Sequence, residues 1–157
     1  MYNNFSVVVG NILSVKKGII IHGCNARGVM GSGVAWDIRT LYPGAFDVYY
    51  NKKKETGLIV GEVVWYRHRE TDLYIANAIT QENYGRGFKN ICYVDYNSIS
   101  KVFKEVTQKA LELNLPVHFP KIGAYRGGGN WDIIFSLIKT QMHPSVEYVL
   151  WHYNETK

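Results

Sequence analysis

The residues best suited to chemistry lie in a glycine-rich stretch that follows a short apolar run. Gly18–Ile21 has the apolar character of a buried strand, and His22–Trp36 follows it directly. Within that stretch, Asn25–Gly33 holds one asparagine and three glycines before a segment predicted to be helical. A helix N-terminus preceded by such a loop offers free backbone N–H groups and a partial positive charge to an anion. We therefore predict a ligand that carries a phosphate or diphosphate group.

The stretch matches neither of the two common phosphate-binding motifs. A P-loop ends in Gly-Lys-Ser or Gly-Lys-Thr, and His22–Trp36 contains neither sequence. A dinucleotide-binding fingerprint needs a third small residue where Val34-Ala35-Trp36 stands. The class of ligand therefore has to be inferred from the stretch together with the rest of the chain.

Two further segments are expected beside this stretch. Gly10–Ile12 follows a predicted strand at Phe5–Val9, and Ile122–Gly129 follows a predicted strand at Pro116–Phe119. The alternation of strands and helices predicts a three-layer α/β/α domain with a mixed, mostly parallel sheet. Such sheets bind ligands at the carboxyl ends of their strands. Two glycine-rich loops that converge there predict a phosphate cradle, whereas either loop alone could be a tight turn.

The other predicted elements follow from hydrophobic periodicity and from helix-start and helix-stop residues. Asn130 is the expected N-cap of the last helix. We predict helices at Gly33–Leu41, Ala45–Gly57, Asp95–Leu113 and after Asn130, strands at Glu62–Tyr66, Leu73–Ala78 and Val146–Trp151, and a polar loop at Thr80–Phe88.

The size and composition fit one globular domain spanning residues 1–157. The formal net charge of +5 favours an anionic partner, although the only basic run, Lys52–Lys54, is assigned to a solvated helix end. Cys24 and Cys92 lack metal-ligand spacing, and no apolar run approaches the ~18 residues needed to span a membrane. We expect a cytoplasmic monomer with no membrane or nucleic-acid partner, no metal and no cofactor.

Aromatic residues are abundant for so small a domain. The chain contains 12 tyrosines and 4 tryptophans. Some of these rings are expected to be exposed and able to stack on a ligand base, whereas covering the core is the alternative for each single ring.

The order of these motifs along the whole chain resembles that of macro domains, which bind ADP-ribose and its derivatives. The resemblance is found at Gly10–Leu13, His22–Asn25, Met30–Ala35, Leu41–Pro43, Pro120–Tyr125 and Gly128–Trp131. Within the family it is closest to the yeast-type and phage ADP-ribose 1″-phosphate phosphatases. It implies the macro-domain fold and a cleft for ADP-ribose.

The resemblance also implies which residues meet the ligand. Asn11 stands where the family usually has an aspartate that contacts adenine, and it keeps an acceptor for the adenine amino group. Asn25 falls at the position that meets the distal ribose. The implied binding residues are Gly10, Asn11, Ile12, Cys24, Asn25, Met30, Gly31, Ser32, Gly33, Val34, Lys121, Ile122, Gly123, Ala124, Tyr125, Arg126, Gly127 and Tyr153.

Three of these side chains have an equally plain alternative. Arg126 either pairs with a terminal phosphate or is solvated at the surface. Tyr125 either covers the distal ribose or packs on the protein, and Tyr153 either packs against adenine or has a structural role.

Hydrolysis of a phosphate monoester needs a positioned water, stabilised phosphoryl oxygens and proton transfer. The catalytic candidates are His22, which can titrate near neutral pH, and Asn25, which can orient the water. The alternative for His22 is a hydrogen-bonded core histidine that shapes the loop. Glu82 is a second candidate base, and Cys24 is assigned to packing because no Cys-x5-Arg loop surrounds it. The five histidines are dispersed, so we expect a metal-independent reaction.

The first hypothesis is therefore an enzyme that binds ADP-ribose and removes phosphate from ADP-ribose 1″-phosphate. The second is a hydrolase that releases ADP-ribose from modified proteins or nucleic acid. The resemblance places Gln81 and Gly127 where the glycohydrolase of the broader group has a lysine and an aspartate, which argues against its mechanism. The remaining hypotheses are an ADP-ribose reader without turnover and, on net charge alone, a small nucleic-acid-binding domain.

Overall fold

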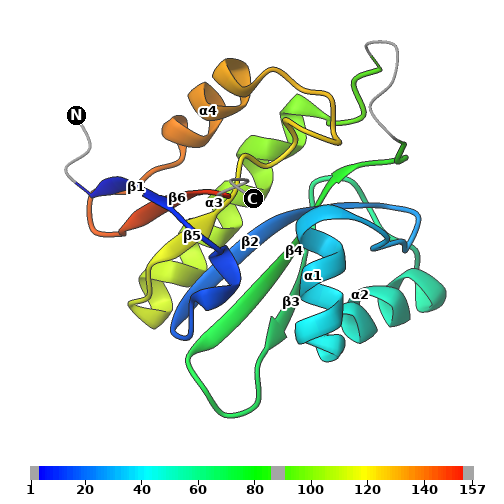
Figure 1. Cartoon of the computed structure of the whole chain (residues 1–157), viewed down its shortest axis with the longest axis horizontal. Helices are drawn as coiled ribbons and strands as arrows, with labels where there is room; N and C mark the ends of the chain where they lie inside the picture. The colour runs from blue at the N-terminus through cyan, green and yellow to red at the C-terminus, as the bar shows by residue number, and fades with distance from the viewer. Residues whose placement is uncertain (1–3, 86–90, 154–157) are drawn as a thin grey trace.

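The computed structural model describes residues 4–85 and 91–153, which form one six-stranded sheet with helices on both faces (Figure 1). The strand order is β1-β6-β5-β2-β4-β3. The strands are β1 (Phe5–Val9), β2 (Gly18–Asn25), β3 (Val63–Arg67), β4 (Leu73–Gln81), β5 (Val117–Phe119) and β6 (Tyr148–His152). The helices are α1 (Gly33–Leu41), α2 (Pro43–Glu55), α3 (Tyr96–Leu113) and α4 (Trp131–Thr140), with a short 3-10 helix η1 (Ile12–Ser14).

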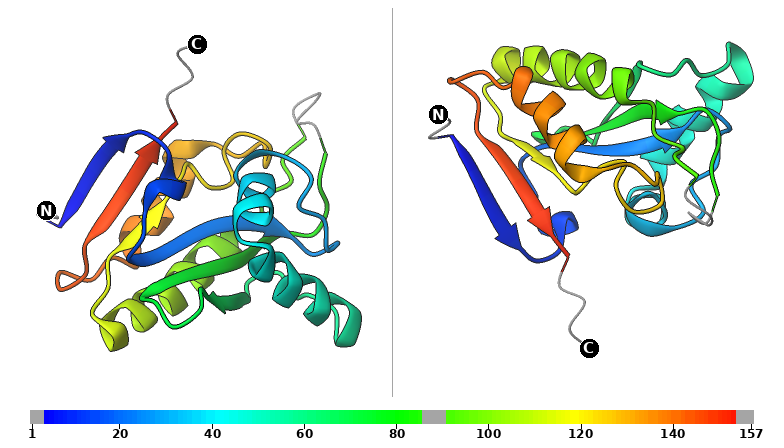
Figure 2. Two further views of the ribbon diagram at one scale, coloured as in Figure 1. Left: turned by 60° about the horizontal axis from the view of Figure 1, so that its bottom comes forward. Right: turned by 90° about the horizontal axis from the view of Figure 1, so that it is seen from above.

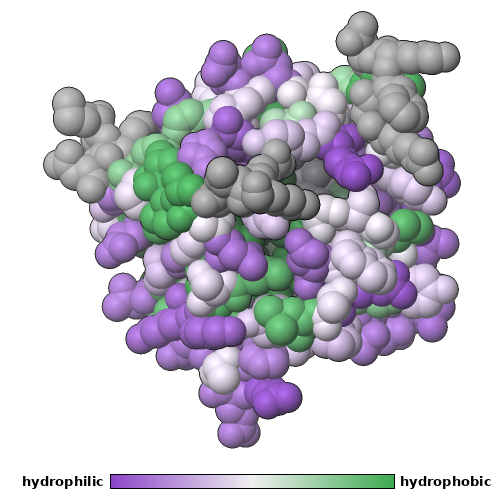
Figure 3. All heavy atoms as spheres, in the orientation of Figure 1, coloured by the Kyte–Doolittle hydropathy of each residue, from purple (hydrophilic) through white to green (hydrophobic). Residues whose placement is uncertain are grey.

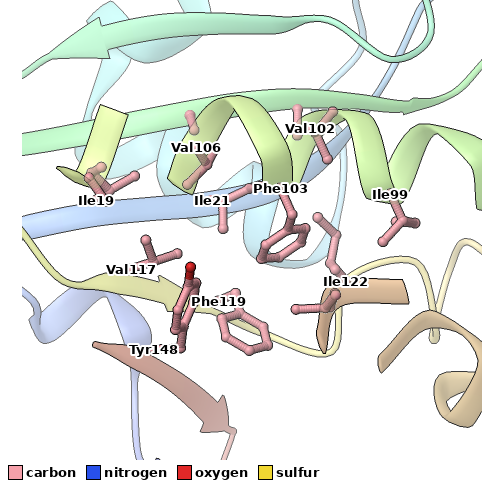
Figure 4. Close-up of a cluster of buried hydrophobic side chains, with 14 of the residues drawn as sticks. Ile19, Ile21, Ile99, Val102, Phe103, Val106, Val117, Phe119, Ile122 and Tyr148 are labelled. Atoms are coloured by element: carbon pink, nitrogen blue, oxygen red, sulfur yellow. The ribbon is translucent and has the colours of Figure 1, made fainter. Parts of the chain in front are cut away.

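Successive side chains of β2 point to opposite faces of the sheet and define the two halves of the core. Ile19 and Ile21 pack with Phe103 under α3 and α4 (Figure 4). Ile20 packs with Ile38 on the face that α1 and α2 cover. Each fully buried side chain of this size contributes about 1.5–3 kcal/mol to stability. Two further views show the helices on either side of the sheet (Figure 2), so the predicted three-layer α/β/α fold is confirmed.

All strand pairs are parallel except β3 with β4. The carboxyl ends of β1, β6, β5, β2 and β4 therefore share one edge of the sheet, which we call the carboxyl edge. The glycine-rich segments after β1, β2 and β5 meet there, as predicted. The residues that follow the five strands at this edge are Gly10, Tyr153, Pro120, Ala26 and Glu82.

Two strands are longer than predicted, because polar side chains interrupt their apolar pattern. β2 continues through His22 to Asn25, and β4 continues to Gln81 rather than ending at Ala78. His22 of β2 is paired with Asn77 of β4, and the two buried side chains form a hydrogen bond with each other. The first four residues of the predicted glycine-rich stretch are thus strand. The predicted loop Thr80–Phe88 begins at Glu82, and its residues 86–88 lie outside the described part of the chain.

The helices agree closely with the sequence-based predictions. α1 has the predicted bounds, and Asp95 and Asn130 cap α3 and α4 through their side chains, as expected of such residues. α2 begins two residues early, at Pro43, because the fixed φ of proline suits the first helical position. Among the described residues, no helix combines the length and apolar character needed to cross a membrane.

β1 is an edge strand with apolar side chains on the surface. Val7 and Val9 are 50% and 67% exposed. Apolar side chains gather over this edge at the left of Figure 3, whereas much of the rest of that face is hydrophilic. This patch belongs to the sheet edge and is separate from the glycine-rich loops.

Candidate functional site

The first loop, residues 26–32, is organised by the side chain of Asn25. Its Oδ1 accepts hydrogen bonds from the backbone N–H groups of Arg27 (3.0 Å) and Val29 (3.3 Å). Its Nδ2 donates to the carbonyl of Val29 (2.8 Å). The hydroxyl of Tyr49, from α2, donates to the Asn25 backbone oxygen (2.6 Å) and lies 3.0 Å from Oδ1. Asn25 is 8% exposed, and these hydrogen bonds of its side chain hold the loop closed on itself.

The N-terminus of α1, which follows the first loop, is open. Ser32 occupies the N-cap position but makes no capping hydrogen bond, and the first turn carries no acidic residue. Gly31, Ser32 and Gly33 are all exposed. Side chains cap η1, α3 and α4, whereas α2, which begins at Pro43, also lacks a side-chain cap. The free N–H groups and the positive end of the helix dipole at α1 are therefore suited to an anion.

The second loop, residues 120–130, is compact and depends on its glycines. Gly123 and Gly128 have φ values of +79° and +68°, which favour glycine. A Cβ at Gly127 would lie 2.5 Å from the Gly123 oxygen, and one at Gly128 would lie 2.2 Å from the Ile91 oxygen. The glycine cluster is thus required by packing within the protein. The side chains that this loop exposes to solvent are those of Tyr125, Arg126 and Asn130, and Asn130 caps α4.

The segment after β4 joins the two loops. Ala26 donates through its backbone N–H to the oxygens of Gln81 (2.9 Å) and Glu82 (3.2 Å), and the Arg27 Nε donates to the Asn83 Oδ1 (2.8 Å). On the other side, the backbone N–H groups of residues 93 and 94 donate to the Gly127 oxygen at 2.7 and 3.0 Å. Both glycine-rich loops are therefore held against the same connecting segment.

His22 lies on the buried side of β2 that faces α2. Its Nε2 is 2.7 Å from the Asn77 Oδ1, and the Asn77 Nδ2 donates to the Ala45 oxygen (3.0 Å). Because the amide nitrogen of Asn77 must face a carbonyl, its oxygen faces His22, and the imidazole therefore donates through Nε2. Burial lowers the pKa of His22 to about 4, against the opposing effect of the Asn77 hydrogen bond. Only 1% of the residue is exposed, so the structure favours the core alternative for His22.

Cys24 also points into the protein. Its Sγ lies 3.6 Å from His22 Nε2 and 3.8 Å from Nδ1, and burial raises the pKa of the thiol far above its usual range. A protonated, buried thiol is a poor nucleophile, which fits the assignment of Cys24 to packing. Within residues 4–85 and 91–153, no group of three or more His, Cys, Asp or Glu side chains is arranged to hold a metal ion.

The residues that the resemblance assigns to adenine, Asn11 and Tyr153, follow β1 and β6. Asn11 caps η1 by accepting from the Leu13 N–H (2.9 Å), so one lone pair of its Oδ1 is already used. A Cβ at Gly10 would lie 3.3 Å from the Trp151 ring, so glycine allows the chain to approach that ring closely. Tyr153, directly after β6, is 66% exposed. This corner therefore offers a polar side chain and two aromatic rings to a ligand.

All of the predicted binding residues lie at or next to the carboxyl edge, but only some are accessible. The exposed ones are Asn11, Gly31, Ser32, Gly33, Tyr125, Arg126 and Tyr153. The buried ones are Ile12, Cys24, Asn25, Met30, Ile122 and Gly127, and the others are half-buried. The buried members shape the loops, whereas the exposed members are available to a ligand.

Two residues that organise the site were not predicted from the sequence. Tyr49 and Asn77 hold Asn25 and His22, respectively, from positions 24 and 55 residues away along the chain. A buried asparagine in an otherwise apolar strand is a recognisable signal for Asn77. For Tyr49, one tyrosine among 12, no comparable signal exists.

Known proteins were compared with the chain by sequence. No family model matches it. An ADP-ribose 1″-phosphate phosphatase of Candida glabrata is 27% identical over 136 residues, covering 80% of this chain and 76% of the relative. An uncharacterised 17.5 kDa protein of phage T4 is 28% identical over 129 residues, or 77% of each chain. A DNA ADP-ribosyl glycohydrolase of Mycobacterium tuberculosis is 26% identical over 147 residues, which cover 90% of this chain but 40% of the relative.

Solved structures agree with the chain over nearly its whole length. The macrodomain of Thermus aquaticus DarG has a TM-score of 0.78 at 22% identity, covering 94% of this chain and 97% of the other. The chain has the fold of a macro domain. A macrodomain protein of Streptomyces coelicolor has a TM-score of 0.77 at 22% identity, and the match covers 96% of this chain and 99% of the other. The macro-domain resemblance inferred from the loops is thus confirmed at the level of the fold.

Proposed function

We propose that this macro domain binds ADP-ribose, with its diphosphate at the N-terminus of α1. The open N-terminus of α1, with exposed Gly31, Ser32 and Gly33, carries this proposal. Two negatively charged phosphates match free N–H groups and the helix dipole. A Thermosipho africanus DarTG structure in complex with ADP-ribose has a TM-score of 0.77 to this chain, at 18% identity, which supports the choice of ligand.

The two ends of the ligand then follow from the positions of the loops. Adenine extends toward the corner formed by Asn11, Trp151 and Tyr153, where rings are available for packing. The distal ribose extends toward the two glycine-rich loops, where Tyr125 and Arg126 are exposed. Asn25 supports this end by fixing the first loop, and its amide has one further N–H for a ribose hydroxyl or a water.

We further propose hydrolysis of ADP-ribose 1″-phosphate to ADP-ribose and phosphate. A water oxygen attacks phosphorus and gives up a proton to a base, the bond from phosphorus to the 1″ oxygen breaks, and that oxygen takes up a proton from solvent. Arg126 is suited to stabilising the phosphoryl oxygens. The relative from Candida glabrata, an ADP-ribose 1″-phosphate phosphatase, supports this assignment.

Glu82 is the group that we assign to take the proton of the attacking water. It is exposed, and its backbone oxygen accepts from Ala26, so it lies directly beside the first loop. The burial of His22 and its low pKa, about 4, argue instead for a structural role. We therefore assign proton transfer to Glu82 and the shaping of the strand end to His22.

A second candidate is release of ADP-ribose from a modified macromolecule, as the name of the mycobacterial relative describes for that protein. The side chain of Gln81 donates to the Asn83 oxygen (2.8 Å) and cannot act as a nucleophile or base. This argues against a lysine-dependent mechanism but leaves the macro-domain cleft available for other chemistry.

Two measurements test the proposal. Calorimetry with ADP-ribose is expected to show binding, and its failure even at high ligand concentration would overturn the macro-domain cleft as an ADP-ribose site. Incubation with ADP-ribose 1″-phosphate is expected to release inorganic phosphate. Binding without release would reject the phosphatase and leave a reader or an ADP-ribosyl hydrolase, which ADP-ribosylated protein and DNA substrates would separate.

A further inference from the structure

The exposed aromatic rings of this macro domain are concentrated on one side. Among the described residues, the strongly exposed aromatic side chains are Trp36, Tyr50, Tyr84, Tyr125 and Tyr153, at 49%, 41%, 54%, 73% and 66%. All five lie in or next to the carboxyl edge, whereas the turns at the opposite edge, residues 15–17, 68–72, 114–116 and 141–147, contain no Phe, Tyr or Trp. Exposed rings gathered at one edge of the described part of the chain indicate a surface for a partner with flat, stackable groups.

The two glycine-rich loops at this edge carry positive charge. The two glycine-rich loops, residues 26–32 and 120–130, contain Arg27, Lys121 and Arg126 and no carboxylate. Lys53 packs beside Gly28 of the first loop, since a Cβ at that glycine would lie 3.2 Å from the lysine side chain. Lys52, in contrast, is paired with Glu62 at 3.1 Å. Outside the two loops, this edge also carries the carboxylates of Glu82, of Asp95 at the N-cap of α3 and of Asp132 in the first turn of α4.

Cations and rings are also interleaved on α1 and α2. The Arg39 guanidinium lies 3.9 Å from the Phe46 ring and 5.8 Å from the Trp36 ring. Phe46 stacks on Tyr50 with ring centroids 5.5 Å apart, and the Lys54 ammonium lies 5.0 Å from Tyr50. Such alternation of rings and cations is typical of surfaces that bind single-stranded nucleic acid.

We call the surface formed by the exposed rings and by the cations Arg27, Lys53 and Arg126 the rim. We propose that the rim binds a single-stranded nucleic acid, so that the strand passes the mouth of the cleft. Its relation to a bound ADP-ribosyl group rests on the proposed function. The backbone phosphates pair with Arg27, Lys53 and Arg126, and successive bases stack on exposed rings such as Trp36 and Tyr84. One ADP-ribose has a single base, so it cannot occupy rings that extend from the end of β6 to α2. No nucleic-acid partner is expected from the sequence, because the rings and cations are dispersed along the chain and meet only in the fold.

The test is fluorescence anisotropy of the full chain with a labelled single-stranded oligonucleotide of mixed sequence, over a range of salt concentrations. Trp36→Ala and Tyr84→Ala are each expected to weaken binding about fivefold or more, which corresponds to the loss of one base–ring stack. Arg27→Ala is expected to make the slope of log affinity against log salt shallower by about 0.7, because one phosphate contact is lost. Lys16→Ala and Leu111→Ala, at the opposite edge, are the controls and are expected to change neither quantity.

Calorimetry with ADP-ribose on the same variants separates this inference from the proposed function. Trp36→Ala and Tyr84→Ala are expected to keep the affinity for ADP-ribose. The proposal that the rim binds nucleic acid would be rejected if the oligonucleotide did not bind at low salt. It would also be rejected if the rim variants and the control variants weakened oligonucleotide binding equally. Displacement of the strand by saturating ADP-ribose would also overturn it, because the strand would then occupy the cleft itself. Strand binding with no ADP-ribose binding would reject the proposed function and leave the rim intact.

Discussion

The Tyr49 hydroxyl lies 2.6 Å from the backbone oxygen and 3.0 Å from the side-chain oxygen of Asn25, and both residues are buried. Through this contact α2 holds the residue that organises the first loop. The contact fixes the first loop, residues 26–32, at its start. Because α1 follows this loop directly, the open N-terminus of α1 is positioned by the same contact. The geometry of the proposed anion site thus depends on a side chain that is fully buried.

Tyr49→Phe is therefore expected to weaken ADP-ribose binding as well as the fold. Removing the hydroxyl leaves the buried oxygens of Asn25 with fewer donors, which costs about 1–3 kcal/mol in the free energy of unfolding. The loosened first loop then binds the diphosphate less well. Urea denaturation measures the first effect and calorimetry the second.

Tyr148→Phe is the matched control for this prediction. Tyr148 is also fully buried, and its hydroxyl bonds to Thr107 (2.8 Å) and to the N–H of His143 (3.0 Å), away from the glycine-rich loops. It is expected to lower stability to a similar extent without changing the affinity. Equal loss of affinity in both variants would mean that Tyr49 acts only through global stability.

His22 is expected to make the fold sensitive to acid. Burial lowers its pKa to about 4 from the ordinary 6.5, so the unfolded chain binds a proton in this range that the folded chain does not. The stabilisation is therefore complete above pH 6.5 and is lost as the pH falls toward 4. A difference of this size corresponds to about 3 kcal/mol. Urea denaturation at several pH values is expected to show a falling free energy of unfolding.

His22→Gln removes this titration and is expected to flatten the pH dependence between pH 4 and 6.5. Burial also lowers the pKa of His118 to about 4, so part of the dependence is expected to persist. The rate of phosphate release should change only as far as the loop is disturbed. A loss of about 100-fold or more in kcat, with ADP-ribose affinity kept, would instead identify His22 as the proton-transferring group.

The elements that position the site could be predicted where local chemistry decides them. The bounds of α1 follow from glycines before it and Tyr42-Pro43 after it, and Asn130 caps α4 as its residue type suggests. The ends of β2 and β4 could not be predicted, because His22 and Asn77 are polar yet buried, and only their mutual hydrogen bond makes this possible.

The role of the glycines in the second loop differs from the prediction. Its glycines suggested close approach of a phosphate, but a Cβ at Gly128 or Gly129 would collide with Ile91 or Val94. These contacts join segments more than 30 residues apart along the chain. Glycine composition alone cannot separate approach to a ligand from approach to another part of the same chain. The start of α1 differs, because nothing lies within 4 Å of a Cβ at Gly33.

Gly33→Ala tests the anion site at α1. Gly33 has a φ of +63° and open space around it, so an added methyl strains the backbone and also stands among the free N–H groups. Loss of one charge-assisted hydrogen bond costs about 1.5–3 kcal/mol, so ADP-ribose affinity is expected to fall about tenfold or more. Calorimetry measures the affinity.

Gly57→Ala controls for the backbone strain alone. Gly57 has a φ of +81°, and a Cβ there also meets nothing within 4 Å, but it follows α2 rather than preceding α1. Both variants are expected to lose similar stability, about 1 kcal/mol. Unchanged affinity in Gly33→Ala would place the diphosphate elsewhere.

Glu82→Gln tests the proposed transfer of a proton from the attacking water. The amide keeps the size and much of the hydrogen bonding of the carboxylate, and the backbone oxygen that accepts from Ala26 is retained. The first loop should therefore stay in place, and the affinity for ADP-ribose should be unchanged. Without the base, kcat for phosphate release is expected to fall by about 10²–10⁴-fold.

Glu70→Gln, which alters an exposed carboxylate in the β3–β4 turn at the opposite edge, is the control and should retain full activity. If Glu82→Gln also retains full activity, the water is deprotonated by another group or by the substrate phosphate itself, and the role assigned to Glu82 is wrong.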